Sequence, residues 1–403
     1  MGGNAIAVEE AVESLLSYVN KPSDYEELPL LGGLGRTIRG DVCARINQPP
    51  FDRSPLDGYA VIHSDLIGAS KQKPARLRVT QYICAGDVPH STLKPGEAAR
   101  IMTEAPLPAG ATCVVRQEVT DSGNDVVGIY QTQSEYENYC FSGEDIAVGQ
   151  PLIRDGDRLD CVRMGVLAGQ GFAQVKVYPK PKVSLFSTGN EVSPIGGPLE
   201  PGKIYDSNCC LLSLRSVEIG ADVVAMDCLP DDPETLASAL QKALCCSDLV
   251  ITTGGVSVGA HDHMPLVGEM LGAHRLFHGI AAKPGSPALA LEKDGKLVLC
   301  LSGNPFAAFA TFELLAAPVI RKLSGRSIVM GKRLTGTLME CFNKPSLGRR
   351  FLRARLEAGS VYLPGGRHAS GMLCSLVDCN CLVDIPAGSG GLTAGDPVEV
   401  IML

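Results

Sequence analysis

The segment Ser247–His263, which reads SDLVITTGGVSVGAHDH, constrains the fold of this chain more than any other. Leu249–Thr253 is a run of five apolar or β-branched residues, which predicts a strand buried on both faces of a parallel sheet. The run stops at Gly254 and Gly255, where the absence of a Cβ lets the backbone approach a ligand and form an anion-binding nest. A tight turn followed by a solvated Asp262 remains the alternative that this pattern leaves open.

The same arrangement of a short apolar strand and a polar, glycine-containing loop occurs twice more. Val183–Ser187 runs into Thr188-Gly189-Asn190-Glu191, and Leu297–Leu301 runs into Ser302-Gly303-Asn304-Pro305. Strand and helix patterns alternate between these segments, which predicts a doubly wound sheet with right-handed crossovers. Such sheets bind ligands beyond the carboxyl ends of their strands, so we expect the three loops to meet at one site.

The flanking segments have other periodicities. Ala5–Val19 carries an apolar stripe that predicts an amphipathic helix. Residues 75–120 alternate as strands do and predict a small β domain, and short strands recur after Arg326. Asp231-Asp232-Pro233-Glu234 has the composition of a helix start, where one of the two aspartates serves as the cap.

Composition excludes several classes of protein. A net charge of −8 over 403 residues argues against a nucleic-acid-binding surface, and no apolar run approaches the length of a membrane span. Met1–Asn20 lacks the basic start of a secretory signal. The fifteen cysteines have no zinc-site spacing, so we expect free thiols and a cytoplasmic protein.

GGVSVGAHD resembles the signature of the molybdopterin molybdenumtransferase family, and further motifs follow in the order typical of that family. They are PPFDRSPLDGYAV with Asp57, IMT with Thr103, SGEDI with Asp145, TGNEV, and SGNP. The resemblance implies a multidomain α/β plus β fold: a doubly wound α/β molybdopterin-binding domain, an inserted small β domain and a C-terminal β-barrel-like domain. Its expected parts are a helix (1–24) packing on the α/β domain, a linker domain (25–43 and 150–176), the inserted domain (44–149), the α/β domain (177–328) and the barrel (329–403).

The resemblance also implies an activity, the insertion of molybdate into adenylylated molybdopterin with release of AMP, dependent on Mg²⁺. The catalytic carboxylates would be Asp57, Asp145, Glu191, Asp231 and Asp262, and the last three would bind the metal. Substrate-binding residues would be Thr103, Thr188, Gly189, Asp206, Asn208, Gly254, Gly255, Ser257, Gly259, Lys283, Gly303, Asn304, Pro305, Arg350 and Ser370. A homodimer with a shared active site is implied, with a molybdopterin adenylyltransferase and molybdoenzymes as partner classes.

The chain departs from the family pattern at several positions. Glu104 replaces a usual glycine and Asn190 a usual aspartate, while Cys140, Gly279 and Ser286 stand where the family often has basic residues. Two alternatives therefore stay open. One is a molybdopterin adenylyltransferase with the same α/β domain, and the other is a paralogue with altered activity or a scaffold, as in the related domain of gephyrin. The preference between molybdate and tungstate is also open.

Overall fold

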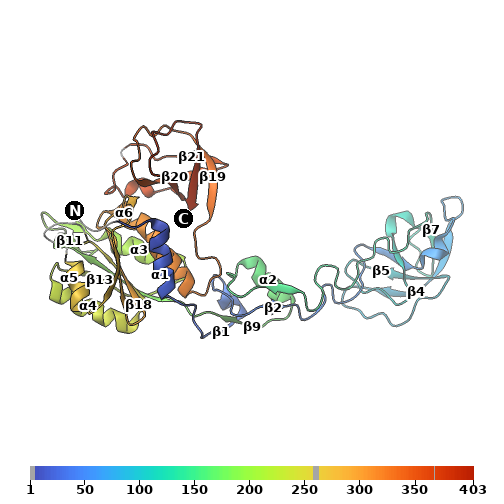
Figure 1. The fold of residues 1–403 in the computed structure, drawn as a ribbon. Coiled ribbons are helices and arrows are strands. Elements are labelled where there is room, and N and C mark those ends of the chain that lie inside the picture. The colour runs from blue at the N-terminus through green and yellow to red at the C-terminus, as the bar shows by residue number, and fades with distance from the viewer. Residues whose placement is uncertain (1–4, 257–262, 367) are drawn as a thin grey trace. The chain divides into compact units, whose positions relative to one another are not determined.

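The computed structural model describes residues 5–256, 263–366 and 368–403, and the chain forms two compact units (Figure 1). The first unit comprises Met1–Gly40, Asp155–Met164 and Ala173–Leu403. The second comprises Asp41–Arg154 and Gly165–Phe172. The predicted multidomain α/β plus β fold is confirmed, whereas the five domain boundaries stay predictions.

The first unit is built on a six-stranded sheet with the order β13-β10-β14-β18-β17-β15. The strands β13, β10, β14 and β18 are parallel, as the strand–helix alternation predicts. The strand bounds are β10 (Lys182–Thr188), β13 (Asp222–Leu229), β14 (Leu249–Thr253), β15 (His274–His278), β17 (Leu289–Lys293) and β18 (Lys296–Leu301). All five residues of β14 are buried, in agreement with a strand covered on both faces.

Helices cover both faces of this sheet. One face carries Leu185, Ile251 and Leu299 in a core shared with α1 (Val8–Tyr18), α3 (Ser207–Glu218), α6 (Pro305–Thr311) and α7 (Ala317–Leu323). The other face carries Phe186 and Val250 in a core shared with α4 (Pro233–Cys246) and α5 (Met264–Met270). Side chains of successive strand residues point to opposite faces, so one apolar run supplies both cores.

Two features differ from the sequence expectation. Strands β15 and β17 add an antiparallel edge to the sheet, because His274–Lys293 forms no crossover helix. The helical segment from Pro305 to Leu323 is not one regular α-helix, because a π-helical turn at Phe312–Ala316 separates α6 from α7. That turn places Glu313 in the interior, where Arg215 Nε donates to its carboxylate at 2.6 Å.

The C-terminal strands close into a ring. Pairing runs β20-β21-β19-β23-β22 and returns from β22 to β20, which makes the predicted barrel five-stranded. The strands are β19 (Arg333–Leu338), β20 (Arg349–Glu357), β21 (Ser360–Tyr362), β22 (Cys381–Ile385) and β23 (Pro397–Met402). The short strand β16 (Ala282–Lys283) leaves the α/β part and pairs with β20 in parallel.

The first unit also contains two small ladders and part of a helix. Strand β1 pairs with β9, and β11 pairs with β12. The bounds are β1 (Glu26–Pro29), β9 (Gln174–Val177), β11 (Val192–Ser193), β12 (Ile204–Tyr205) and α2 (Cys161–Gly169), whose residues divide between the two units.

The second unit is a five-stranded sheet of order β6-β3-β5-β4-β7, with a separate ladder of β2 and β8. Its strands are β2 (Val42–Cys43), β3 (Gly58–Val61), β4 (Ala75–Ile83), β5 (Glu97–Ile101), β6 (Cys113–Arg116), β7 (Val126–Ile129) and β8 (Pro151–Ile153). The predicted strand segments between residues 75 and 120 are confirmed. Single 3₁₀ turns lie at Leu30–Gly33, His63–Leu66, Gln117–Val119 and Cys374–Leu376.

Glu104 keeps a backbone conformation that suits glycine. Its φ is +67°, in the left-handed region where a residue with a Cβ costs about 1–2 kcal/mol. The carboxylate of Glu104 forms an ion pair with Arg53, and its N–H donates to the Ser54 carbonyl oxygen at 2.8 Å. The loop therefore retains a glycine-type turn although the glycine is replaced.

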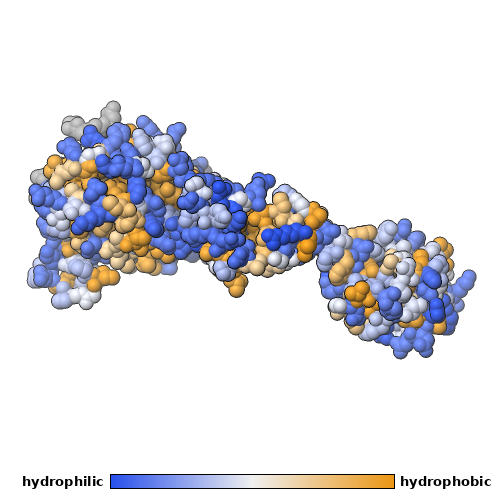
Figure 2. Space-filling model, turned by 90° about the horizontal axis from the view of Figure 1, so that it is seen from below, coloured by the Kyte–Doolittle hydropathy of each residue, from blue (hydrophilic) through white to orange (hydrophobic). Residues whose placement is uncertain are grey.

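Hydrophilic and hydrophobic residues are interspersed on the face drawn in Figure 2. Among the residues that the structure describes, no helix is both long and apolar enough to span a membrane. None of the fifteen cysteines forms a disulfide in the structure.

An ion pair buried in the barrel generates the first prediction. Burial alone would raise the pKa of Asp384, but hydrogen bonds from Arg349 (2.7 and 2.8 Å) and Arg333 (2.9 Å) outweigh it and lower that pKa. Asp384→Asn should lower the free energy of unfolding by about 3 kcal/mol at pH 7, since it removes the buried carboxylate that Arg349 and Arg333 share and leaves them only exposed acidic partners. A carboxyl whose pKa is lower in the folded state stabilises the folded protein fully above its unfolded pKa of about 3.9. This contribution is lost as the pH falls through the folded pKa, so the stability difference between Asp384→Asn and the parent should vanish at lower pH.

Urea midpoints at pH 7 and pH 3 measure this difference. Glu399→Gln is the matched control, because Glu399 pairs with Arg333 at 3.2 Å from an exposed position and should contribute little. An Asp384→Asn effect that persists unchanged at pH 3 would contradict the electrostatic explanation.

Candidate functional site

A pocket of about 750 Å³ lies at the carboxyl ends of β10, β14 and β18. Ser187 stands opposite Thr253 in the ladder, and Thr253 stands opposite Leu301, so the three strands end at the same level. The chain passes from β10 to β13 on one side and later to β14 on the other. This reversal is the topological switch point at which open α/β sheets bind ligands.

The described residues of the pocket lining include nine of the sequence-predicted substrate-binding residues and two of the predicted carboxylates. They are Thr188, Gly189, Asp206, Asn208, Gly254, Gly255, Gly303, Asn304 and Pro305, with Glu191 and Asp231. Ser257, Gly259 and Asp262 lie outside the described residues.

Close backbone packing requires glycine at position 254 of the pocket and brings Gly303 into van der Waals contact with it. A Cβ on Gly254 would lie 2.4 Å from the Thr188 carbonyl oxygen, and the φ of Gly254 is +95°. A Cβ on Gly303 would lie 3.5 Å from the Gly254 Cα. The loops after three strands therefore meet backbone to backbone, which leaves the pocket floor open to a ligand.

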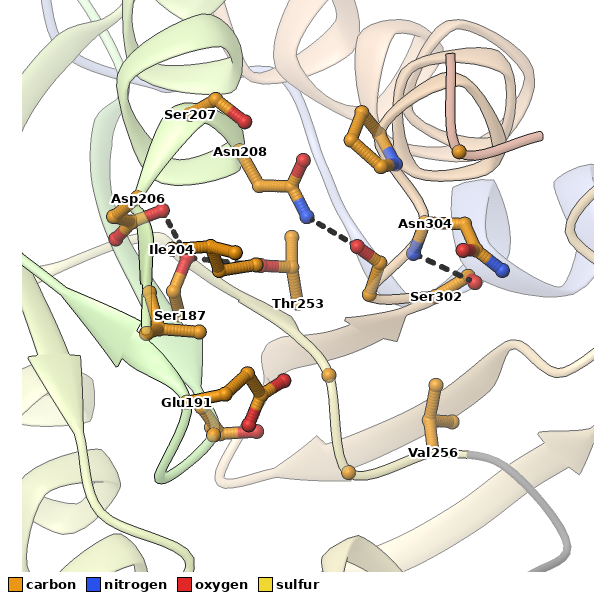
Figure 3. A pocket seen from close by; sticks show the side chains of 18 of the residues that line it. Ser187, Glu191, Ile204, Asp206, Ser207, Asn208, Thr253, Val256, Ser302 and Asn304 are labelled. Carbon is orange, nitrogen blue, oxygen red and sulfur yellow. Dashed lines mark hydrogen bonds between the residues drawn. The ribbon is translucent and has the colours of Figure 1, made fainter. Parts of the chain in front are cut away.

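A hydrogen-bond network fixes the wall next to β10 (Figure 3). Ser187 Oγ donates to Asp206 Oδ1 at 2.7 Å and lies 3.0 Å from Thr253 Oγ1. Asp206 also caps α3, because its carboxylate accepts from the Cys209 N–H at 3.0 Å. The Asp206 carboxylate therefore already has two donors.

Two buried polar atoms in this pocket have no partner among the described residues. They are Thr188 Oγ1 and Asn208 Oδ1, whereas Asn208 Nδ2 donates to the Gly303 carbonyl oxygen at 2.7 Å. Burying a polar atom without a hydrogen bond costs about 1–3 kcal/mol. A bound ligand with both donor and acceptor groups would satisfy these two atoms.

The pocket mouth is negatively charged. Asp231 and Asn190 exchange long hydrogen bonds, each from a backbone N–H to the other side chain at 3.4 Å. Burial, together with the charges of Asp206, Asp227, Glu191 and Asp231, raises the pKa of the nearby Cys228 thiol to about 11.

The paired aspartates divide their roles as predicted from helix capping. Asp232 caps α4, accepting from the Thr235 N–H at 2.8 Å and from Thr235 Oγ1 at 2.6 Å. Those hydrogen bonds lower the pKa of Asp232. Asp231 makes no such cap and lines the pocket.

A second pocket of about 930 Å³ adjoins the first, because Pro287, Ser302 and Asn304 line both. Three predicted residues, Lys283, Arg350 and Ser370, line this second pocket. Lys283 is the register partner of Arg350 in the β16–β20 ladder. The lysine from the α/β part and the arginine from the barrel therefore belong to one site.

The second pocket contains two cations that the sequence patterns did not indicate, Lys344 and Arg349. His368 also lines it, and burial together with the charges of Arg353 and Lys344 lowers the pKa of its imidazole. Arg350 is held by Ser346, whose Oγ accepts from its Nε at 2.9 Å, and Arg349 is paired with Asp384. Lys283 is exposed and has no hydrogen bond or ion pair among the described residues. Of the three positions where the family often has a basic residue, Ser286 lines this pocket, Gly279 is absent from both linings, and Cys140 belongs to the second unit.

Arg353 supports the wall between the two pockets. It is 1% exposed, its guanidinium lies 4.2 Å from the Phe306 ring centroid, and Nη2 donates to the Ala369 carbonyl oxygen at 3.1 Å. The Phe306 N–H in turn donates to the Ser370 carbonyl oxygen at 2.9 Å. These contacts fix Ser370 against the start of α6, and no sequence pattern indicated them.

The remaining predicted residues belong to the second unit. Thr103 donates to Asp57 Oδ1 from its N–H and from Oγ1, both at 2.7 Å, and these hydrogen bonds lower the pKa of Asp57. Asp145 is exposed, and its N–H donates to the Gln48 carbonyl oxygen at 3.0 Å. Asp57 is thus held as an ordered, ionised carboxylate.

Comparison with known proteins gives three family matches in chain order. Residues 6–171 match the MoeA N-terminal region (domains I and II), residues 184–322 the "Probable molybdopterin binding domain", and residues 335–403 the MoeA C-terminal region (domain IV). Together with the switch-point pocket, they define a multidomain protein with an α/β domain of the molybdopterin-binding class.

Relatives that match this chain over nearly its full length identify the family within this class. A molybdopterin molybdenumtransferase from Staphylococcus aureus is 35% identical, covering 99% of this chain and 96% of its own length. One from Staphylococcus epidermidis is 34% identical over 98% and 95%. A crystal structure of a molybdopterin biosynthesis MoeA protein from Pyrococcus horikoshii is 34% identical with a TM-score of 0.84 over 99% of both chains. The chain belongs to the molybdopterin molybdenumtransferase family, a family of enzymes of molybdenum cofactor biosynthesis.

Proposed function

We propose that this enzyme inserts molybdate into adenylylated molybdopterin and releases AMP, in a reaction that depends on Mg²⁺. The observation that carries the proposal is the shared wall of the two pockets at Ser302 and Asn304. One pocket offers glycine backbone, unpartnered polar atoms and carboxylates, and the other offers cations. An organic substrate and a tetrahedral dianion would therefore meet at that wall.

The first pocket suits the adenylylated pterin. Thr188 Oγ1 and Asn208 Oδ1 have no hydrogen-bond partner among the described residues. The pterin and the ribose of the adenylate carry donors and acceptors that could bond to them. The backbone of Gly254 and Gly255, both with positive φ, lies open to a phosphate group. The Ser187–Asp206–Thr253 network would keep this wall rigid while the substrate is held.

The first pocket also has carboxylates of the kind that Mg²⁺ prefers. Glu191 and Asp231 line it, and no cluster of three or more metal-ligating side chains occurs among the residues described. One or two carboxylates completed by water and substrate phosphate are typical of Mg²⁺, whereas zinc requires a fuller protein shell. When bound, Mg²⁺ supplies neutralisation of the phosphoanhydride charge.

The second pocket suits molybdate. Lys283 is an exposed ammonium without a partner among the described residues, and Arg350 stands beside it with its Nε held by Ser346. Ammonium and guanidinium N–H groups are the donors that an oxyanion requires. The pterin dithiolene supplies the sulfur ligands of molybdenum, so no protein cysteine is needed in this pocket.

The adjacent aspartates of the α4 start allow a matched test of the carboxylate role. Asp231→Asn should abolish release of AMP, because it removes a negative ligand from the pocket. Asp232→Asn should leave turnover nearly unchanged, since Asn caps helices as well as Asp does. Turnover is measured at several Mg²⁺ concentrations and in EDTA, and equal activities of the two variants would refute the assignment.

A second test concerns the oxyanion. Lys283→Ala should weaken molybdate binding about ten- to a hundred-fold, the loss of one charge-assisted hydrogen bond of about 1.5–3 kcal/mol. Ser286→Lys should strengthen it, because the new ammonium lines the same pocket. Lys293→Ala on β17 is the control that also removes one ammonium. Equilibrium dialysis measures molybdate binding, and parent-like binding by Lys283→Ala would exclude Lys283 as a molybdate ligand and leave Arg350 and Ser370 as the candidates.

We further propose that the active site is shared in a homodimer, with Asp57 supplied by one subunit and Asp231 by the other. Subunits carrying Asp57→Asn and Asp231→Asn should each be inactive as homodimers. After mixing and exchange, the two-fold symmetry leaves one intact site in each heterodimer, so activity should return to about one quarter of the parent value. A mixture that stays inactive while exchange is verified by mass spectrometry would show that both aspartates come from one subunit.

A molybdopterin adenylyltransferase remains the alternative reaction, because it uses the same α/β fold. It would form the adenylate rather than release AMP, so incubation with ATP and molybdopterin distinguishes the two reactions. A molybdopterin adenylyltransferase and molybdoenzymes are the proposed partner classes on either side of this step.

A further inference from the structure

A third pocket of about 210 Å³ lies in the first unit and shares no lining residue with the other two. Its walls come from segments far apart in the sequence: the turn after Leu34, the loop at Arg158, the segment before β10, and the C-terminal ends of α3 and α7. Four cations line it, namely Arg36, Arg158, Lys180 and Arg326, whereas Glu218 is the single carboxylate in the described lining.

Half of these cations already have acidic partners. Arg36 pairs with Glu26 at 2.7 Å, and Lys180 pairs with Asp222 at 3.1 Å. Glu218 is engaged by Arg215 at 3.0 Å. The three carboxylates around the pocket, those of Glu26, Asp222 and Glu218, are therefore already paired with Arg36, Lys180 and Arg215.

Arg158 and Arg326 have no carboxylate partner among the described residues. Arg158 donates only from Nε, to the Gly35 carbonyl oxygen at 3.3 Å. Arg326 donates from Nη2 to the Ile219 carbonyl oxygen at 2.6 Å, and its Nε is buried without a partner. A guanidinium has five N–H donors, so most donors of both side chains are unused by the described residues.

The guanidinium groups of Arg158 and Arg326 each lie next to a glycine, and they repel each other electrostatically. A Cβ on Gly35 would lie 3.5 Å from Arg158 Nη2, and a Cβ on Gly220 would lie 3.5 Å from Arg326 Nη2. Burial, followed by the charges of Arg158 and Arg321, lowers the pKa of Arg326 to about 10. The positive charge gathered here is thus not compensated within the described chain.

Helix capping explains only part of this cluster. The C-terminal ends of α3 and α7 favour cations, and the Arg326 bond to Ile219 is a cap of that kind. Capping does not explain why Arg158 is brought close to Arg326, nor why Arg326 Nε is buried without an acceptor.

We propose that this third pocket binds a tetrahedral dianionic oxyanion of the phosphate class between Arg158 and Arg326. Its volume is below the roughly 300–1,000 Å³ of pockets for drug-sized ligands, which suits a single phosphate group rather than a whole nucleotide. The guanidinium fork matches such an oxyanion because its N–H groups donate in parallel to two oxygens. The source is either the free ion or the terminal phosphate of a phosphomonoester.

Thermal unfolding of the full-length protein with inorganic phosphate, at ionic strength held constant with NaCl, tests the proposal. Phosphate should raise the Tm saturably beyond the effect of NaCl, because it binds only the folded state. Arg158→Gln should raise the apparent dissociation constant for phosphate at least ten-fold. In the absence of phosphate, Arg158→Gln should not lower the Tm, since it relieves the repulsion between Arg158 and Arg326. If Arg158 had a purely structural role, the substitution would lower the Tm.

Two controls separate this site from others. Arg275→Gln removes an exposed arginine of β15 outside the pocket and should leave the phosphate response unchanged. Lys283→Ala alters the proposed molybdate pocket, and the part of the phosphate response that depends on Arg158 should persist in this variant, so the two proposals fail independently. Absence of a phosphate-specific Tm rise, or an Arg158→Gln response equal to that of the parent, would overturn the inference.

Parallel titrations identify the source of the oxyanion. A phosphomonoester such as glycerol 3-phosphate that acts through Arg158 at lower concentration than phosphate assigns an organic phosphate. Stabilisation by phosphate and not by the ester assigns the free ion. A response to molybdate that also depends on Arg158 supports the site as a general oxyanion pocket.

Discussion

The parallel register of β10, β14 and β18 is the constraint on which the site depends. Its ladders bring Ser187, Thr253 and Leu301 to one level, so the three loops that follow begin side by side. Gly254 then packs so closely on Thr188 that a Cβ would collide with the Thr188 carbonyl oxygen. The pocket is therefore formed by backbone whose position is fixed by sheet hydrogen bonds, and side chains on rigid strand ends are held where a ligand would need them.

The junction of the α/β part with the barrel forms the second, cationic pocket of the site. Strand β16 leaves the α/β part to pair with β20, which sets Lys283 beside Arg350. Arg353, buried between Phe306 and Ala369, fixes the segment that carries Ser370. Carboxylates gather on one side of Ser302 and Asn304 and cations on the other, so opposite charges occupy adjacent pockets without neutralising each other.

The departures from the family pattern have different structural consequences. Glu104 keeps the positive φ of the glycine that it replaces and pairs with Arg53, so that loop is preserved at a small conformational cost. Asn190 keeps contact with Asp231 through two long hydrogen bonds. Ser286 removes an ammonium from the second pocket, and Gly279 has a φ of +101°, at which a lysine would be strained. Among the positions where the family often has a basic residue, Ser286 is therefore the one whose replacement removes positive charge from the pocket that contains Lys283.

The sequence by itself determined the parallel strands, the helix start at Asp231-Asp232-Pro233-Glu234 with one aspartate as its cap, and the convergence of three strand-end loops. These follow from local properties, namely apolar runs, glycine and capping side chains, which act over a few residues. Only the tertiary structure decided that Lys283 and Arg350 belong to one pocket, that Arg353 braces Ser370, and that Arg158 approaches Arg326. Those pairs lie 67, 17 and 168 residues apart in the sequence, and strand pairing and burial set their proximity, which no local pattern encodes.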